Sequence, residues 1–205
     1  MFNKKEAIKT LETIVIAILI ALFIRTFIVQ AFDIPSGSMK STLLPGDYIL
    51  VNKFIYGIRI PFVGARMFSF KEPKRGDVIV FIFPKDPSKD FIKRVIGVQG
   101  ETVQIINGKI YINNMPITDP WGYFDKKEPP GFIESVENFG PVVVPDRSLF
   151  VMGDNRNNSE DSRFWGVLPL DNVLGKAFII YFSWNSTAEN LTDKVRWSRI
   201  GELIH

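Results

Sequence analysis

The sequence contains no cysteine and a single histidine, His205, at its last position. Without cysteine the chain has no disulfide, no thiolate nucleophile and no thiolate metal site. One histidine cannot supply a histidine metal cluster, and it leaves a serine nucleophile without its usual proton acceptor. Any serine chemistry in this chain therefore needs a different base, and we expect neither a metal nor a cofactor.

The chain also lacks a strong charge imbalance. Its 205 residues include 25 basic and 22 acidic side chains, which give a formal net charge of +3. Because the basic residues are spread along the sequence, they form no basic face for nucleic acid. The hydrophobic content of 46% and the aromatic content of 13% exclude a disordered chain and indicate one modest globular domain with an appendage.

The appendage is an apolar stretch near the N-terminus. Residues 11–32, LETIVIAILIALFIRTFIVQAF, are numerous enough to cross the core of a bilayer. Three lysines precede this stretch, so the positive-inside bias predicts a cytoplasmic N-terminus over 1–10. The same bias places residues 33–205 on the extracytoplasmic face of the cell membrane.

Two alternatives exist for this stretch. A basic start and small residues up to Ala31 also fit a cleavable signal peptide, but Arg25 lies between the apolar run and that cut. A buried core helix is disfavoured because the segment is apolar around its whole circumference. We therefore expect an uncleaved, single-pass transmembrane helix.

After the anchor, short runs of β-branched and aromatic residues alternate with turn signals. They predict strands at 48–54, 78–83, 91–98, 102–106, 109–112, 149–152 and 176–184. Asn107 and Gly108 form a strong two-residue hairpin signal between two of these runs. We expect a mainly β fold of coiled sheets with a barrel-like domain and a small variable insertion around 113–145.

A serine-rich turn follows the anchor: residues 34–47 read IPSGSMKSTLLPGD. A lysine can replace histidine as the base for a serine if it is kept neutral. Free lysine has a pKa of ~10.4, so about three pKa units of depression are required, and burial is the only large effect available. Lys93 in DFIKRVIGV and Lys53 in ILVNKFIY both lie in apolar runs. Both also fit lysines that protect edge strands, so this criterion does not choose between them.

A polar segment, GDNRNNSEDSRFWG, occupies residues 153–166. Its aspartates and asparagines are typical of calcium loops, but Arg156 falls at the third ligand position of an EF-hand and Ser159 at its glycine. Local Asx turns explain much of the composition. The functional interpretation is a rigid loop that presents a hydroxyl and an ion pair to a site.

Taken together, these stretches resemble the type I signal peptidases, which are membrane-anchored Ser-Lys proteases that remove signal peptides from exported proteins. The motifs that carry the resemblance, in the family's order, are PSGSM (35–39), TLLPGDYILVNKFIYG (42–57), RGDVIVF (75–81), FIKRVIGVQGE (91–101) and GDNRNNSEDSRFWG (153–166). The resemblance implies a monomeric serine endopeptidase with a catalytic β domain. Its implied partners are the lipid bilayer and signal peptides with small residues before the cut.

The resemblance also implies a role for each matching position. It makes Ser38 the nucleophile of an acyl-enzyme mechanism and Lys93, rather than Lys53, the general base. The Ser36 hydroxyl and the Ser38 N–H would form the oxyanion hole. The other implied positions are Ser159, which orients the lysine amine; Asp161, Arg163, Asp154 and Arg156, which support the site; and Phe32, Ile34, Met39, Leu43, Phe91 and Ile92, which line substrate pockets.

Two positions depart from the family pattern: Ser41 stands where proline is usual, and Asn157 where aspartate is common. Neither supplies a catalytic atom, so the expected activity is unchanged. One rival interpretation is a self-cleaving repressor, which needs a DNA-binding domain in place of residues 1–32. The other is a membrane-tethered β module that binds an exported partner without catalysis, for which Lys93→Arg would be nearly silent.

Overall fold

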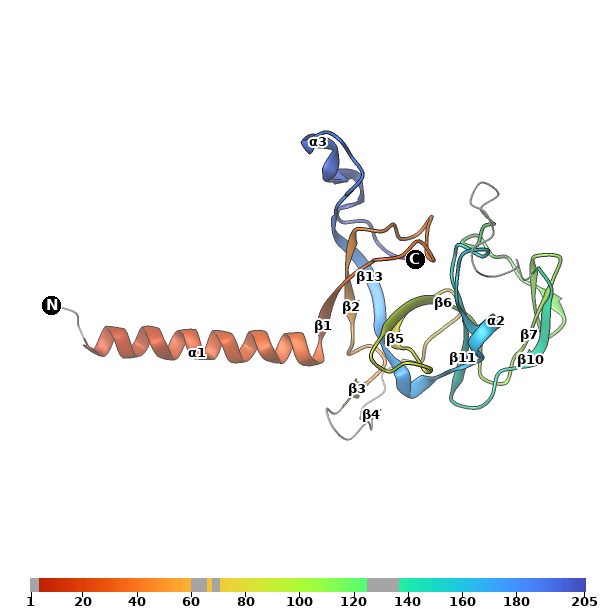
Figure 1. Cartoon of the computed structure of the whole chain (residues 1–205). Coiled ribbons are helices and arrows are strands. Elements are labelled where there is room, and N and C mark those ends of the chain that lie inside the picture. Colours follow the sequence, from red (N-terminus) through yellow and green to blue (C-terminus); the bar gives the residue numbers. More distant parts are fainter. Residues whose placement is uncertain (1–3, 60–65, 68–70, 125–136) are drawn as a thin grey trace.

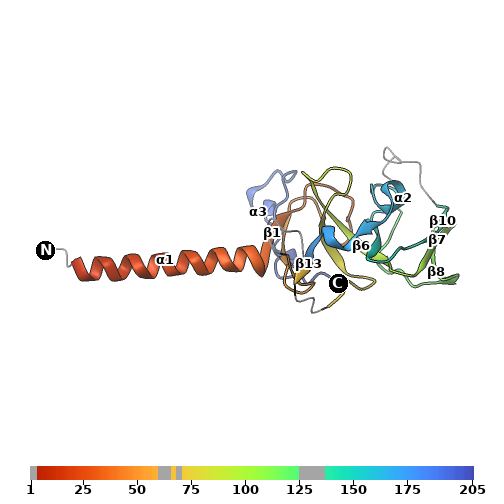
Figure 2. The same ribbon diagram turned by 90° about the horizontal axis from the view of Figure 1, so that it is seen from below.

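The computed structural model of the chain describes residues 4–59, 66–67, 71–124 and 137–205. A long N-terminal helix, α1 (Lys4–Phe27), projects from a β body (Figures 1 and 2). Its segment contains neither proline nor glycine and is rich in leucine, isoleucine and alanine, so nothing interrupts the backbone hydrogen-bond ladder. Side chains such as Leu19 and Phe23 are exposed along it.

The sequence predicts one helix over residues 11–32, but the structure divides this run between a helix and a strand. The helix begins earlier, at Lys4, and after Phe27 the chain extends into strand β1 (Val29–Asp33), which pairs with a neighbouring strand from Val29 to Asp33. The hydrogen bonds of that pairing replace those of a continued helix. Within the described residues, no helix has both the length and the apolar character that a membrane crossing requires.

The β body contains one large antiparallel sheet that curls into a half-barrel (Figure 1). Its two edges are β1 and β12, and the strand that carries Lys93, β6, lies between β5 and β11. In spatial order the strands are β1, β2 (Asp47–Asn52), β13 (Val173–Ser183), β5 (Val78–Ile82), β6 (Asp90–Val98), β11 (Ser148–Met152) and β12 (Leu168–Pro169).

A second, smaller sheet lies at the end of the body farthest from α1 (Figure 2). Its strands, in order, are β10 (Phe139–Val143), β7 (Thr102–Ile106), β8 (Lys109–Ile112) and β9 (Met115–Pro116). Asn107 and Gly108 connect β7 to β8 and both have positive φ, as a tight hairpin turn requires. The remaining elements are β3 (Ile58–Arg59), β4 (Arg66–Met67), α2 (Ser162–Trp165), α3 (Leu191–Lys194) and the 3-10 turns Leu170–Asn172 and Trp197–Arg199.

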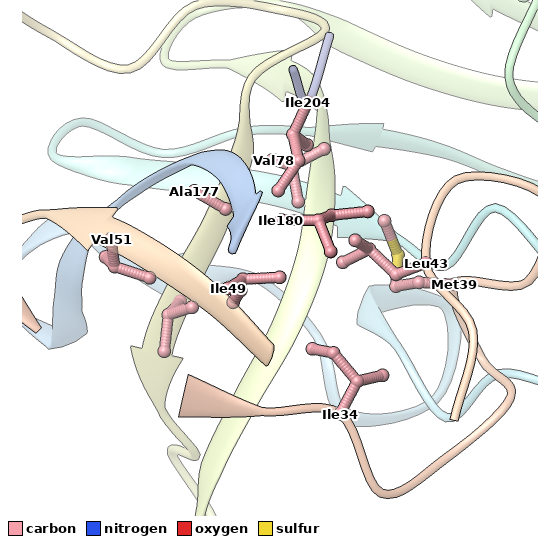
Figure 3. Packing of buried hydrophobic residues seen from close by; sticks show 10 residues of the cluster. Ile34, Met39, Leu43, Ile49, Val51, Val78, Ala177, Ile180 and Ile204 are labelled. Carbon is pink, nitrogen blue, oxygen red and sulfur yellow. The ribbon is translucent and has the colours of Figure 1, made fainter. Parts of the chain in front are cut away.

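The core that supports the candidate site packs between β2, β5, β13 and the segment after β1 (Figure 3). Met39 and Leu43, from the turn that carries Ser38, are fully buried in it beside Ile180. Burying a side chain of this size stabilises a fold by about 1.5–3 kcal/mol. The turn is therefore held to the body by its own apolar residues.

Candidate active site

Ser38 lies in the loop that joins β1 to β2. Two hydrogen bonds close the base of this loop: the Ile34 N–H donates to the Asp47 carbonyl and the Gly46 N–H to the Ile34 carbonyl, each at 2.9 Å. Within it, the Leu43 N–H donates to the Met39 carbonyl at 2.8 Å. Because Met39 and Leu43 enter the core, the neighbouring Ser38 is fixed at the surface of the sheet, close to β6.

Lys93 reaches Ser38 from β6. Its Nζ is 2.8 Å from the Ser38 Oγ and 3.1 Å from the carbonyl oxygen of Ile92. Only 4% of the Lys93 surface is exposed, and burial lowers the pKa of the amine from 10.5 to about 8. Nearby carboxylates, Asp161 foremost, oppose this shift without cancelling it. The burial that the sequence predicts for the lysine is confirmed.

Lys53, the other candidate lysine, lies away from this position. It follows Asn52, which pairs with Val29 at the beginning of β1, whereas Ser38 comes after the end of that strand. The Lys53 Nζ donates to the Oε1 of Gln30 at 3.1 Å. Of the two lysines that the burial criterion left open, the fold brings Lys93 to the serine.

A cleft with a volume of about 360 Å³ contains both Ser38 and Lys93. Four of the six residues expected to bind substrate line it: Phe32, Ile34, Phe91 and Ile92. The other two, Met39 and Leu43, are buried in the core and are not among the residues that line the cleft. The other lining residues are Asp33, Pro35, Ser36, Gly37, Val80, Asp90, Asn158 and Glu160.

The polar segment 153–166 packs against this cleft and contains the predicted ion pair. Both Asp161 oxygens accept hydrogen bonds from Arg163, from its Nε and its Nη2, each at 2.8 Å. Asp161 also caps α2 and accepts the Gly153 N–H at 3.0 Å. Both partners are buried, and a bidentate pair of this kind fixes the orientation of the loop.

Asp154 and Arg156 also lie in the buried part of the segment, but they have different partners. Arg156 pairs with Asp119 at 2.5 Å and donates to the Gly153 carbonyl at 3.1 Å. Asp154 pairs with Arg94, whose Nε and Nη2 reach its two oxygens at 2.8 and 2.7 Å. Asp154 and Arg156, two residues apart, therefore tie the polar segment to two other parts of the chain.

Arg94 is a residue of the site that the sequence analysis missed, except to exclude it as a base. It is fully buried, and its Nη1 donates to the carbonyls of Gly76 and His205 at 2.7 and 2.6 Å. Its position next to Lys93 on an apolar strand is the signal that could have identified it, because a buried arginine must be paired.

Ser159 is buried in the polar segment, but no hydrogen bond links it to the lysine amine. Its Oγ has no hydrogen-bond partner among the described residues. The side chain instead packs against Gly153, where an added Cβ would lie 2.3 Å from the Ser159 Oγ. The hydrogen bond to Lys93 that the resemblance implies is therefore absent from this structure.

The departure at Ser41 has a conformational basis. Ser41 has a φ of 79°, whereas the ring of proline fixes φ near about −65°. Its Oγ donates to the Trp121 carbonyl at 3.4 Å. A proline at this position is incompatible with the observed turn.

Comparisons with known proteins identify the family of this chain. A family model described as "Signal peptidase, peptidase S26" matches residues 7–184. A signal peptidase I of Pseudomonas aeruginosa is 38% identical over 91% of this chain and 75% of its own length. A signal peptidase I of Aquifex aeolicus is 36% identical over 85% of this chain and 84% of its own length. A signal peptidase I of Leptolyngbya laminosa is 39% identical over 87% of this chain and 81% of its own length.

A crystal structure of a signal peptidase I from Enterococcus faecalis V583 is 30% identical to this chain. The alignment covers 52% of this chain and 97% of that one, with a TM-score of 0.41. The family model and the relatives confirm the resemblance seen in the motifs. The chain therefore belongs to the signal peptidase family, peptidase S26, and is a serine peptidase.

Proposed function

We propose that this peptidase removes signal peptides from exported pre-proteins, with Ser38 as the nucleophile and Lys93 as the general base. The observation that carries the proposal is the 2.8 Å contact between the Lys93 Nζ and the Ser38 Oγ in a buried setting. With a pKa of about 8, much of the amine is neutral at mildly alkaline pH and can accept the serine proton. The names of its relatives support the substrate class.

The reaction proceeds in two steps through an acyl-enzyme. Lys93 takes the Ser38 proton as the Oγ attacks the scissile carbonyl, and it then donates that proton to the departing amine. In the second step Lys93 activates the water that releases the acyl group. The Ser38 N–H and the hydroxyl of Ser36, which is exposed at the rim of the cleft, stabilise the oxyanion of each tetrahedral intermediate.

The substrate binds as an extended strand between β1 and the first residues of β6. The pairing of β11 with β6 begins at Arg94, so residues 90–93 keep an edge that β11 does not cover. An added strand can bond to such an edge through its main chain. Phe32, Ile34 and Ile92 leave shallow space beside it, which favours small side chains before the cut.

Attachment to lipid is the second part of the proposal. The exposed apolar side chains of α1, among them Ile16, Leu19 and Phe23, are costly in water and favourable in a bilayer. The single crossing and the cytoplasmic N-terminus stay predictions from the sequence, as does the monomeric state. The proposal here is limited to attachment through α1.

The test is cleavage of a purified pre-protein with an Ala-X-Ala site by detergent-solubilised enzyme, from about pH 6 to about pH 10. We expect Ser38→Ala and Lys93→Arg to abolish cleavage, and the wild-type rate to rise through a pH of about 8 as Lys93 loses its proton. Lys53→Arg is the matched control and should keep the wild-type profile. Full activity of Lys93→Arg would reject the dyad, and absence of cleavage by a well-folded wild type would favour a binding module.

A further inference from the structure

Asn155 contacts the nucleophile's backbone at two points. It is fully buried in the polar segment, directly after Asp154. Its backbone N–H donates to the carbonyl oxygen of Ser38 at 3.0 Å, and its side-chain Nδ2 donates to the carbonyl oxygen of Gly37 at 3.3 Å. One residue therefore holds the carbonyl groups on both sides of Ser38.

The bond to Gly37 determines where the Ser38 N–H points. The Gly37 carbonyl and the Ser38 N–H belong to the same planar, trans peptide unit, so they point in opposite directions. The Gly37 oxygen is drawn toward Asn155 and also accepts the Lys40 N–H at 3.0 Å. The Ser38 N–H must then point away from the buried polar segment, toward the cleft that Gly37 and Ser38 line.

This peptide unit needs an external restraint because Gly37 precedes it. Glycine accepts a wide range of φ and ψ values, so the unit between Gly37 and Ser38 can rotate at little steric cost. A rotated unit would turn a carbonyl oxygen toward the developing oxyanion, which is repulsive, and would remove a donor. The side chain of Asn155 opposes that rotation, and its backbone bond to Ser38 fixes the next unit.

We infer that Asn155 is a positioning residue that aims the Ser38 N–H at the oxyanion of the intermediate. The inference rests on the proposed function, because an oxyanion forms only if Ser38 attacks a carbonyl. Asn155 itself touches the nucleophile's backbone and acts through Ser38. Its contribution is therefore expected in the transition state and not in substrate binding.

The experiment compares Asn155→Ala with wild type on the Ala-X-Ala pre-protein. Loss of one oxyanion donor costs about 10²- to 10³-fold in rate, so a misaimed donor should lower kcat by roughly 10- to 100-fold with little change in KM. The inhibition constant of a peptide aldehyde, which forms a hemiacetal with Ser38, should rise by about the same factor as kcat/KM falls. The pH at which activity rises should stay at about 8, because the Lys93 contact is untouched.

Asn172→Ala is the matched control. It removes a side-chain amide bond of the same type, from the Asn172 Nδ2 to the Ile82 carbonyl at 3.0 Å, away from the cleft. We expect its kcat and aldehyde affinity to stay close to wild type. Asn155→Ser keeps a small polar side chain at the buried position and should show the same kinetic loss if Asn155→Ala fails to fold.

Two outcomes would overturn the inference. In the first, Asn155→Ala cleaves with wild-type kcat. In the second, Asn155→Ala has a lower kcat together with a displaced pH profile and an unchanged aldehyde affinity, which would indicate damage to the Ser38–Lys93 contact. In both cases the wild type still cleaves in a Ser38-dependent manner and the proposed function stands. If the wild type does not cleave, or if Ser38→Ala cleaves as well, the proposed function itself fails.

Discussion

At the scale of single residues, the buried amine of Lys93 is the most demanding feature of the site. Burial lowers its pKa to about 8, although Asp161, Glu160 and Asp154 favour the charged form. Two of these carboxylates are held by arginines: Asp161 by Arg163 and Asp154 by Arg94. The positive charge of Arg163 also lowers the pKa of Lys93. The ion pairs of the polar segment thus keep carboxylates near the Lys93 amine while limiting their effect on its pKa.

The first prediction concerns Lys93→Met, which replaces the amine by an apolar group of similar shape. The pKa of Lys93 rises from about 8 in the folded state to 10.5 in the unfolded state, so between these pH values the unfolded chain binds more protons. The free energy of unfolding of the wild type therefore increases with pH over that range. Below pH 8 we expect Lys93→Met to be more stable by roughly 3 kcal/mol, from 1.36 kcal/mol per pKa unit.

Urea unfolding at a pH below 8 and again near 10.5 measures this difference. The advantage of Lys93→Met should shrink across the window, while Lys53→Met, at a partly exposed position, should show a much smaller change between the two pH values. An advantage of Lys93→Met that stays constant with pH would show that packing, and not the charge, causes it.

Sequence analysis selected the proposed pair, Ser38 and Lys93, which the structure brings into contact, but it did not predict the surroundings of that pair. The burial requirement reduced the lysines to Lys93 and Lys53, and the resemblance chose Lys93. Arg94 and Asn155 were missed because their partners lie in distant segments, the Asp154 carboxylate and Gly76 carbonyl for Arg94 and the Gly37 carbonyl for Asn155, and no local pattern encodes such contacts. The burial of Met39 and Leu43 in the core was not predicted, because the resemblance assigned them to substrate pockets and an irregular turn has no periodicity that tells which side a residue faces.

At the scale of elements, the junction between β11 and the polar segment sets how closely this segment approaches Ser38. Gly153 forms that junction, and a Cβ added there would lie 2.5 Å from the carbonyl oxygen of Ser38. It would also lie 2.3 Å from the Ser159 Oγ. Only glycine lets the two segments pack at this distance, which the contacts of Asn155 with Gly37 and Ser38 require.

The second prediction follows from this packing. Gly153→Ala should destabilise the fold by about 1–3 kcal/mol, the typical cost of overpacking, because the Ser38 carbonyl is backbone and cannot move aside cheaply. It should also lower kcat/KM by at least about tenfold, since a displacement of about 1 Å in a site can cost 10²-fold. Denaturant unfolding and pre-protein cleavage measure the two effects.

Gly100→Ala is the control for this variant. It has no atom within 4 Å of an added Cβ, so only its positive φ opposes the substitution. We expect a modest loss of stability and normal activity from Gly100→Ala. Equal effects of the two variants on activity would contradict a role for close packing at Gly153.

The elements themselves were largely predictable. All seven strands expected from alternating or apolar runs are present, with ends within three residues of those predicted. β1 was missed because it continues an apolar run, and periodicity does not separate a short strand from the end of a helix. β10 was missed because Gly140 and Pro141 interrupt it, and both residues argue against a strand.

At the scale of the whole molecule, α1 and the active site are joined by one short strand. α1 leads into β1, and the loop after β1 carries Ser38, while the rest of the β body lies beyond it (Figure 1). A surface that holds α1 therefore also sets how far Ser38 and Lys93 lie from that surface. Tethering of this kind raises the effective concentration of a substrate on the same surface without any new contact.

The last prediction tests this arrangement by removing residues 1–27, which leaves β1 and its pairing with β2 intact. We expect the truncated enzyme to keep the melting temperature of the β body and to cleave a soluble peptide at a rate close to that of the full chain. Cleavage of a pre-protein inserted in phospholipid vesicles should fall by about 10²-fold or more, because the effective concentration is lost. In detergent, where both proteins are dispersed, the difference should largely disappear.

Two results would contradict this arrangement. A truncated enzyme that cleaves the vesicle-bound pre-protein as fast as the full chain would exclude a tethering role for α1. A truncated enzyme that loses peptide cleavage would show that the helix supports the site directly.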